Sequence, residues 1–204
     1  MTTSFLIRLG VAGAAALTLS GCALLSTPDP VQTYRFGGAA ATEGATTIAT
    51  PLQVSLRRVD MPAAVQNDRI LSVTGAETAY IGGARWISPA SELYTAALEN
   101  AFVTQATQVR LIGPRELTRS TRSLDIDVRA FEARYETPGA APTVVITIRA
   151  RVLTLPERSV RAERIFTVEQ PAAGNRISAI VEAFDLATRD INAEIVAWTE
   201  ASAV

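Results

Sequence analysis

Asp125 and Asp127 come closer to a catalytic pair than any other residues in this 204-residue sequence. On a β-strand, residues i and i+2 lie on one face, and two carboxylates placed so could serve a glycoside hydrolase or bind a cation. Both alternate with the apolar residues Leu124, Ile126 and Val128, however, and no third ligand accompanies them. This alternation puts the carboxylates on the solvent side of the strand. We therefore interpret the pair as solvated strand-face charges.

The composition removes most of the usual catalytic chemistry. The chain has no His and one Cys, so imidazole catalysis, a thiolate pair and a Cys/His zinc site are excluded unless a partner supplies the missing groups. There is no G-x-S-x-G or G-x-G-x-x-G motif, and a phosphate-binding loop needs a Lys that the chain lacks. We expect a protein that is not an enzyme and holds no cofactor or metal. In an ATP-driven process, another subunit would hydrolyse the ATP.

The basic residues are all Arg. There are 19 of them against 20 acidic residues, and the formal net charge is −1. No nucleic-acid partner is expected, because binding to nucleic-acid phosphates needs a concentrated basic surface. Arg57, Arg58, Arg69 and Arg85 are candidates for one face of an N-terminal hairpin region, where they could contact lipid headgroups or an acidic partner. Solvated strand-face charges explain the same four residues, and both interpretations stay open.

The N-terminal segment has the layout of a secretory signal. Arg8 precedes an apolar run from Leu9 to Leu19 that is too short to span a bilayer as a mature helix. At its end, Leu19-Ser20-Gly21-Cys22 resembles a bacterial lipobox. That resemblance implies cleavage before Cys22, diacylglycerol on its sulfur and acylation of its new amine, with palmitate among the acyl groups. The alternative is a plain signal peptide followed by a buried free Cys.

Hydrophobic periodicity predicts the elements of the remaining chain. The expected strands are 31–36, 52–61, 70–74, 78–81, 84–87, 109–112, 124–135, 144–152 and 160–168, and the expected helices are about 89–107 and 176–200. The parity of the apolar positions changes within 124–135, which predicts a β-bulge near Arg129 to Phe131. Ser88 and Asn175 are the predicted N-caps, with Pro89 at the first helical position.

This order of elements predicts a single α+β domain. We expect a mixed or mostly antiparallel sheet with a long three-stranded meander, and two helices packed on one face. The predicted divisions are a cleaved signal at 1–21, a lipidated tether with a short strand and a flexible loop at 22–47, and the main domain at 48–204. The apolar stripe of the last helix is interpreted as core, or alternatively as a seam for another helix or subunit. Trp86 and Trp198 are expected in the core.

Several of these segments together resemble the ABC-type transport auxiliary lipoproteins. The resemblance rests on Cys22 with its lipobox, Tyr34-Arg35-Phe36, Trp86-Ile87-Ser88-Pro89, Leu124-Asp125-Ile126-Asp127-Val128, Arg134-Tyr135, Phe166-Thr167-Val168-Glu169 and the long last helix. After the Arg-Tyr pair this chain has Glu136-Thr137 and then Pro138-Gly139 in place of an Asp-Gly turn. The only functional position that the resemblance assigns is Cys22.

The resemblance implies a non-catalytic auxiliary subunit in the envelope of a Gram-negative bacterium. Its implied partners are an ABC permease, an ATPase and a mammalian-cell-entry (MCE) domain protein, which together move phospholipid or other hydrophobic molecules. Ala23 stands where an Asp would retain an enteric lipoprotein at the inner membrane, so we expect anchoring at the periplasmic face of the outer membrane. The alternative is a structural or assembly lipoprotein that forms homo-oligomers in an export or pore complex.

Overall fold

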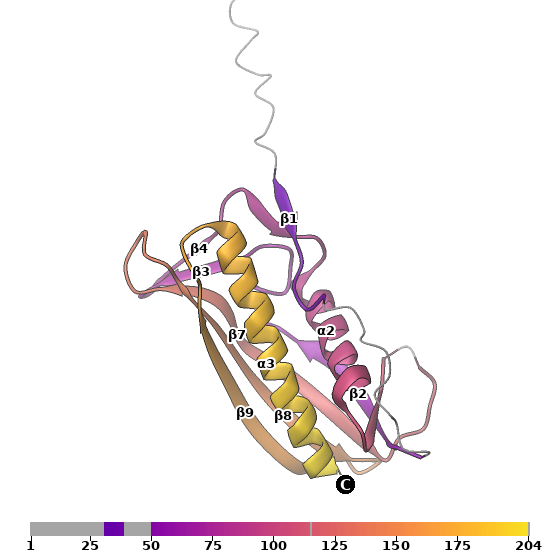
Figure 1. Ribbon diagram of the computed structural model, residues 1–204. Coiled ribbons are helices and arrows are strands. Elements are labelled where there is room, and N and C mark those ends of the chain that lie inside the picture. Colours follow the sequence, from indigo (N-terminus) through magenta and orange to yellow (C-terminus); the bar gives the residue numbers. More distant parts are fainter. Residues whose placement is uncertain (1–30, 39–49, 115, 204) are drawn as a thin grey trace, which may run out of the picture. The chain divides into compact units, whose positions relative to one another are not determined.

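The structure, a computed structural model, describes residues 31–38, 50–114 and 116–203 (Figure 1). In this part of the chain the elements are β1 (Gln32–Tyr34), β2 (Leu52–Asp60), β3 (Leu71–Thr74), β4 (Glu77–Tyr80), β5 (Ala84–Trp86), α2 (Ala90–Gln105), β6 (Val109–Ile112), β7 (Arg122–Tyr135), β8 (Thr143–Thr154), β9 (Ser159–Pro171) and α3 (Ile177–Ala203). The predicted signal segment and Cys22 lie outside the described residues.

Strand β7 organises the main sheet because it is long enough to pair with three others. It pairs antiparallel with β8, and β8 pairs antiparallel with β9. Along its opposite edge β7 pairs parallel with β2 and, further along, with β3. Strand β2 also pairs parallel with β6, and β3 forms an antiparallel hairpin with β4. The sheet is therefore mixed and contains the predicted three-stranded meander, β7–β8–β9.

The predicted β-bulge is confirmed at Arg129. Val128 pairs with Ile148 and Ala130 with Thr147, so one residue of β7 has no counterpart on β8. Before this point the even-numbered apolar residues are buried, and after it Phe131 and the odd-numbered Ala133 are buried. An extra residue in one strand reverses which positions face the core, because side chains alternate between faces.

Both helices cover one face of the main sheet, as predicted (Figure 1). Helix α3 packs against β8 and β9 and alongside α2. Its stripe of buried side chains lies at spacings of three and four residues and consists of Val181, Phe184, Thr188, Ile191 and Ile195. Trp198 is partly buried, with its ring 5.7 Å from that of Phe166 on β9. The stripe therefore belongs to the core, as does Trp86, which is 2% exposed.

A buried hydrogen bond also joins the two helices. The Tyr94 hydroxyl of α2 donates to Oδ1 of Asn192 on α3 at 2.6 Å. Both side chains are buried, and burial raises the pKa of the Tyr94 phenol well above its ordinary value. The pair fixes how the helices face each other, because separating them would leave two buried polar groups unsatisfied.

Both predicted N-caps are wrong. Pro89 is the N-cap of α2, and no side-chain hydrogen bond caps this helix. The amides of Ala90 and Ser91 instead donate to the carbonyls of Asn67 and Gln66, at 2.9 and 3.3 Å. Since a neighbouring loop satisfies these amides, Ser88 is not needed as a cap.

Asn175 is likewise used for another contact. Its Oδ1 accepts a hydrogen bond from Tyr135 at 2.9 Å, and its Nδ2 donates to the carbonyl of Gly139 at 3.2 Å. Helix α3 begins two residues later, at Ile177. The Asn175 side chain therefore ties the start of α3 to the end of β7 and the following turn.

The predicted hairpin system of three short strands is only partly correct. Strands β3 and β4 form a hairpin, but β5 leaves it and pairs parallel with β1 in a separate two-stranded sheet. Gln32 pairs with Ala84, and Tyr34 with Trp86. The first described residues of the chain are thus held beside a segment that lies some fifty positions later.

Candidate functional site

Phe36 attaches the N-terminal end of the described chain to the core. Its side chain is 3% exposed, and its ring centroid lies 4.8 Å from that of Trp86 and 5.1 Å from that of Phe131. Phe184 of α3 completes this aromatic cluster, and its ring centroid lies 5.4 Å from that of Trp86 and 4.9 Å from that of Phe131. Edge-to-face and tilted pairs of this kind add stability beyond the burial of apolar area. Residues from four distant parts of the chain therefore meet at one point.

Gly37 allows the chain to pass close to the helices immediately afterwards. Its φ angle of 68° lies in the left-handed region, and a Cβ atom here would overlap the Cβ of Ala97. Its amide donates to Oδ1 of Asp185 on α3 at 2.8 Å. Any lipid attached at Cys22 would thus be joined to a segment that is itself fixed to the core.

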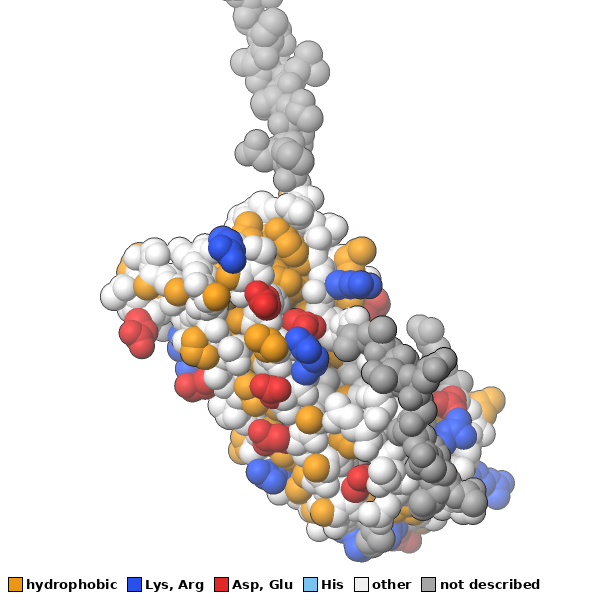
Figure 2. Space-filling view, viewed as in Figure 1, with side chains coloured by type: hydrophobic (Ala, Val, Ile, Leu, Met, Phe, Trp, Pro, Cys, Tyr) orange, Lys and Arg blue, Asp and Glu red, His pale blue; other side chains and the backbone are white. Residues whose placement is uncertain are grey.

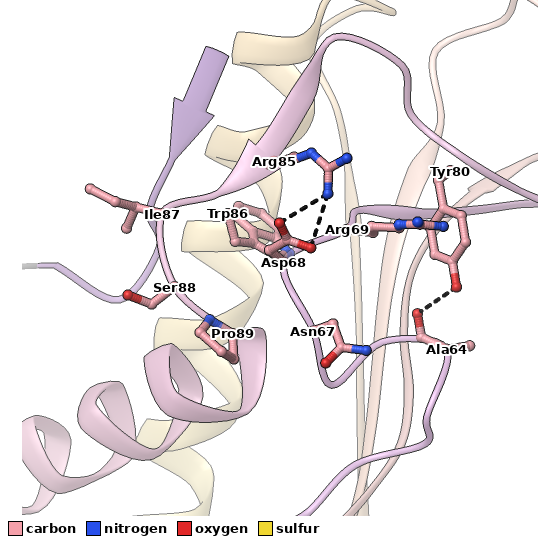
Figure 3. A pocket seen from close by; sticks show the side chains of 10 residues that line it. All are labelled: Ala64, Asn67, Asp68, Arg69, Tyr80, Arg85, Trp86, Ile87, Ser88 and Pro89. Carbon is pink, nitrogen blue, oxygen red and sulfur yellow. Dashed lines mark hydrogen bonds and ion pairs between the residues drawn. The ribbon is translucent and has the colours of Figure 1, made fainter. Parts of the chain in front are cut away.

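An open pocket of 630 Å³ lies at this end of the molecule (Figure 3). We call it the Arg69–Arg85 pocket. It is lined by Ala64, Asn67, Asp68, Arg69, Tyr80, Arg85, Trp86, Ile87, Ser88 and Pro89. These residues come from the loop before β3, the end of β4, strand β5 and the segment that joins β5 to α2.

Backbone hydrogen bonds fix the frame of the pocket. Trp86 N donates to the carbonyl of Asp68 at 2.7 Å, and Ala90 N to that of Asn67 at 2.9 Å. The Tyr80 hydroxyl donates to the carbonyl of Ala64 at 3.2 Å (Figure 3). The walls are therefore attached to one another, although they come from separate elements.

The two arginines of the pocket differ in their partners. Nη1 of Arg85 contacts both carboxylate oxygens of Asp68, at 3.0 and 3.2 Å. Arg69 has no ion pair within the described chain; its guanidinium carbon lies 4.8 Å from the centroid of the Tyr80 ring. A guanidinium over an aromatic face is held by a cation–π interaction. The pocket thus contains two cations and one anion, and one of the cations has no anionic partner among the described residues.

The four arginines that the sequence singled out do not share one face, so that expectation is wrong. Arg69 and Arg85 line the pocket. Arg57 and Arg58 lie on β2 and pair with Asp125 and Asp60. The pocket as a unit is not recognisable in the sequence, because its walls come from separate short segments that tertiary hydrogen bonds and an ion pair hold together.

Asp125 and Asp127 do lie on one face, as predicted. Asp125 pairs with Arg57 at 3.6 Å and with Arg151 at 3.4 Å. Asp127 pairs with Arg149 at 2.9 Å and with Arg129 at 3.2 Å. Each carboxylate is thus surrounded by guanidinium groups, which compensate its charge and would repel a metal cation.

The face that Figure 2 shows carries charges of both signs, interspersed with apolar side chains. No group of three or more His, Cys, Asp or Glu residues that could hold a metal ion occurs among the described residues. In the same part of the chain, neither helix has the length and apolar character needed to cross a membrane.

Two solved structures illustrate the likeness of the fold. A crystal structure of a Xanthomonas campestris protein from the family described as DUF330 superposes with a TM-score of 0.68 at 24% identity, over 85% of this chain and 95% of the other. A hypothetical protein from Chlamydia trachomatis gives a TM-score of 0.51 at 11% identity, over 75% and 98%. A comparison with curated proteins finds no matching sequence.

The family assignment comes from a match over most of the sequence. Residues 34–196 match the family described as the ABC-type transport auxiliary lipoprotein component. The match begins within β1 and ends within α3, so it includes Phe36, the pocket and the main sheet. This chain belongs to the ABC-type transport auxiliary lipoprotein family.

Proposed function

We propose that this protein is a non-catalytic, lipid-anchored subunit of an ABC transport system of the MCE type, which moves phospholipid or other hydrophobic molecules across the cell envelope. The observation that carries the proposal is the family match over residues 34–196, which includes nearly all of the core. The chain also has no Lys for a phosphate-binding loop and no His. Energy from ATP would therefore come from another subunit.

The anchor that we propose is the lipidated Cys22 at the periplasmic face of the outer membrane. The lipobox before Cys22 and the family's description as a lipoprotein support it. Two or more acyl chains give stable attachment, whereas one gives only marginal binding. Val31 comes nine positions after Cys22, so an extended tether would hold the domain within about 30 Å of the bilayer.

Co-purification with an MCE-domain protein tests the partner. The full chain and the MCE protein of the same organism would be co-expressed in a Gram-negative host, and the tagged chain captured in a mild non-ionic detergent. We expect the MCE protein in the eluate in a fixed ratio. Leu117 is exposed on a surface loop, and the variant Leu117→Glu is a control for a surface substitution. This variant should retain the partner. Absence of the MCE protein with both chains well expressed would contradict the proposal.

A second candidate function, a self-assembling structural lipoprotein, has one structural observation in its favour. Strand β9 pairs only with β8 among the described strands, so one edge of a 13-residue strand is open. Val160 and Ile165 on this strand are 55% and 59% exposed. Open edges with apolar side chains are the places where strands of other chains add.

Mass photometry of the purified protein separates this candidate from a monomeric subunit. If copies associate through β9, Ile165→Glu should shift the mass distribution towards monomer. Val103→Glu places the same charge on an exposed apolar position of α2 and should leave the distribution unchanged. A monomer at all concentrations would count against self-assembly.

A further inference from the structure

We propose that the Arg69–Arg85 pocket binds a phosphate group. Two sources share this chemistry: the headgroup of a bilayer phospholipid and a free phosphate in solution. The membrane source rests on the function proposed above, because it needs an anchored domain, whereas the phosphate site itself does not. The inference depends on the charge balance, the fixed frame and the location of the pocket.

The charge balance favours a singly charged anion. Asp68 compensates Arg85, with both carboxylate oxygens on one guanidinium nitrogen. Arg69 has no carboxylate partner in the described part of the chain, and the Tyr80 ring holds it at the pocket wall. One uncompensated guanidinium matches one phosphodiester, and the guanidinium fork suits phosphate oxygens better than an ammonium does. A cation would instead be repelled by the two arginines.

The frame of the pocket is formed before any ligand binds. The bonds from Trp86 N to Asp68 and from Ala90 N to Asn67 hold its floor, and the Tyr80 hydroxyl holds one wall. Figure 3 shows the Asn67 side chain between Pro89 and Ala64. This side chain makes no hydrogen bond to described residues, so its amide is free to donate to a ligand oxygen. A preformed site loses less entropy on binding than one that must order its side chains.

The location of the pocket favours a lipid headgroup. Gln32 N donates to the carbonyl of Gly83, so the start of the described chain lies beside the strand that leads into the pocket. Around this end Val31, Tyr80 and Ile87 are 47%, 41% and 63% exposed. An apolar rim beside an arginine is suited to the boundary between acyl chains and headgroups, where Tyr and Arg are favoured.

Water-soluble headgroups test the site without partition into detergent. The mature full chain, purified in a phosphate-free non-ionic detergent, would be titrated with glycerophosphoglycerol, with inorganic phosphate and with glycerol by isothermal titration calorimetry. Arg69→Gln removes the uncompensated guanidinium. Arg164→Gln is a closely matched control, because Arg164 also lies 4.8 Å from a ring centroid, that of Phe166, but on β9.

We expect glycerophosphoglycerol to bind and glycerol not to bind. Arg69→Gln should weaken binding about tenfold or more, as the loss of a charged hydrogen bond predicts, and Arg164→Gln should not change it. Tighter binding of glycerophosphoglycerol than of inorganic phosphate identifies the lipid headgroup as the source, and tighter binding of inorganic phosphate identifies free phosphate. If neither binds, or if the two variants behave alike, the site is overturned. None of these titrations involves the MCE partner, so failure here is distinguishable from failure of the proposed function.

Discussion

Replacement of Phe36 by Ala tests whether the segment that follows the proposed lipid anchor is part of the core. Phe36 is 3% exposed and contacts the rings of Trp86 and Phe131. Truncation of a buried Phe in a core costs roughly 3–5 kcal/mol. Strand β1 has only three residues and lies at one end of the compact unit, so it can detach. This limits the loss, and we expect about 3 kcal/mol, near the lower end of that range.

Urea unfolding of the mature protein, followed by circular dichroism, measures this loss. For a domain of this size, 3 kcal/mol corresponds to a fall in melting temperature of roughly 6–12 °C. Trp86 adds a local probe, because loss of the Phe36 ring should change its fluorescence. Val31→Ala removes an exposed side chain from the same segment and should cost less than about 0.5 kcal/mol. A loss below about 1 kcal/mol for Phe36→Ala would refute the reasoning, because it would show that the segment around Phe36 is not packed into the core.

Three further changes test the packing and the charges. Gly37→Ala should cost more than Gly75→Ala in urea unfolding, by about 1 kcal/mol or more, because both have positive φ but only the Gly37 site lacks room for a Cβ. Tyr94→Phe should cost about 1–3 kcal/mol at pH 7, because Asn192 loses its buried donor. Since burial raises the Tyr94 pKa, only the unfolded chain loses this proton near pH 10, so wild-type stability should fall above that pH and the deficit of the variant should shrink. Asp127→Asn should change stability by about 1 kcal/mol or less, because its ion pairs are part-exposed; a loss above about 3 kcal/mol would contradict this.

The long elements were predictable from the sequence because their patterns are repeated many times. The meander, the bulge at Arg129 and the buried stripe of α3 each follow from alternation or helical spacing over ten or more residues. One apolar side chain on the solvent face costs little free energy of folding. A register shift in a long strand would move its whole row of apolar side chains to that face at a prohibitive cost, so long patterns determine the register.

The short elements were not predictable in the same way. The pairing of β1 with β5 involves three residues on each strand, and such pairs are determined by what surrounds them, here the burial of Phe36 and Trp86. Ser88 and Asn175 have the right residue types for N-caps. At the start of α2, however, the carbonyls of a neighbouring loop accept from the helix amides, and the Asn175 side chain instead accepts a hydrogen bond from Tyr135. Local propensity gives way to tertiary contacts where few residues are involved.

The candidate site was predictable only in part. Arg69 and Arg85 were noticed as cations, but nothing in the sequence separates them from Arg57 and Arg58, which turn out to pair with aspartates on β7 and β2. What distinguishes Arg69 is the Tyr80 ring beneath it, and this contact depends on the β3–β4 hairpin. Cys22, by contrast, is predicted as the lipidation site by the sequence alone.

The most direct test of the central claim, that lipid at Cys22 holds this family member on a membrane, is the mass of its N-terminal peptide. The full chain would be produced in a Gram-negative host and the peptide measured for wild type and for Cys22→Ser. We predict a wild-type peptide that begins at Cys22 and carries the mass of diacylglycerol plus an N-acyl chain, and a variant without either modification. A wild-type peptide with an unmodified Cys22 thiol would contradict the account.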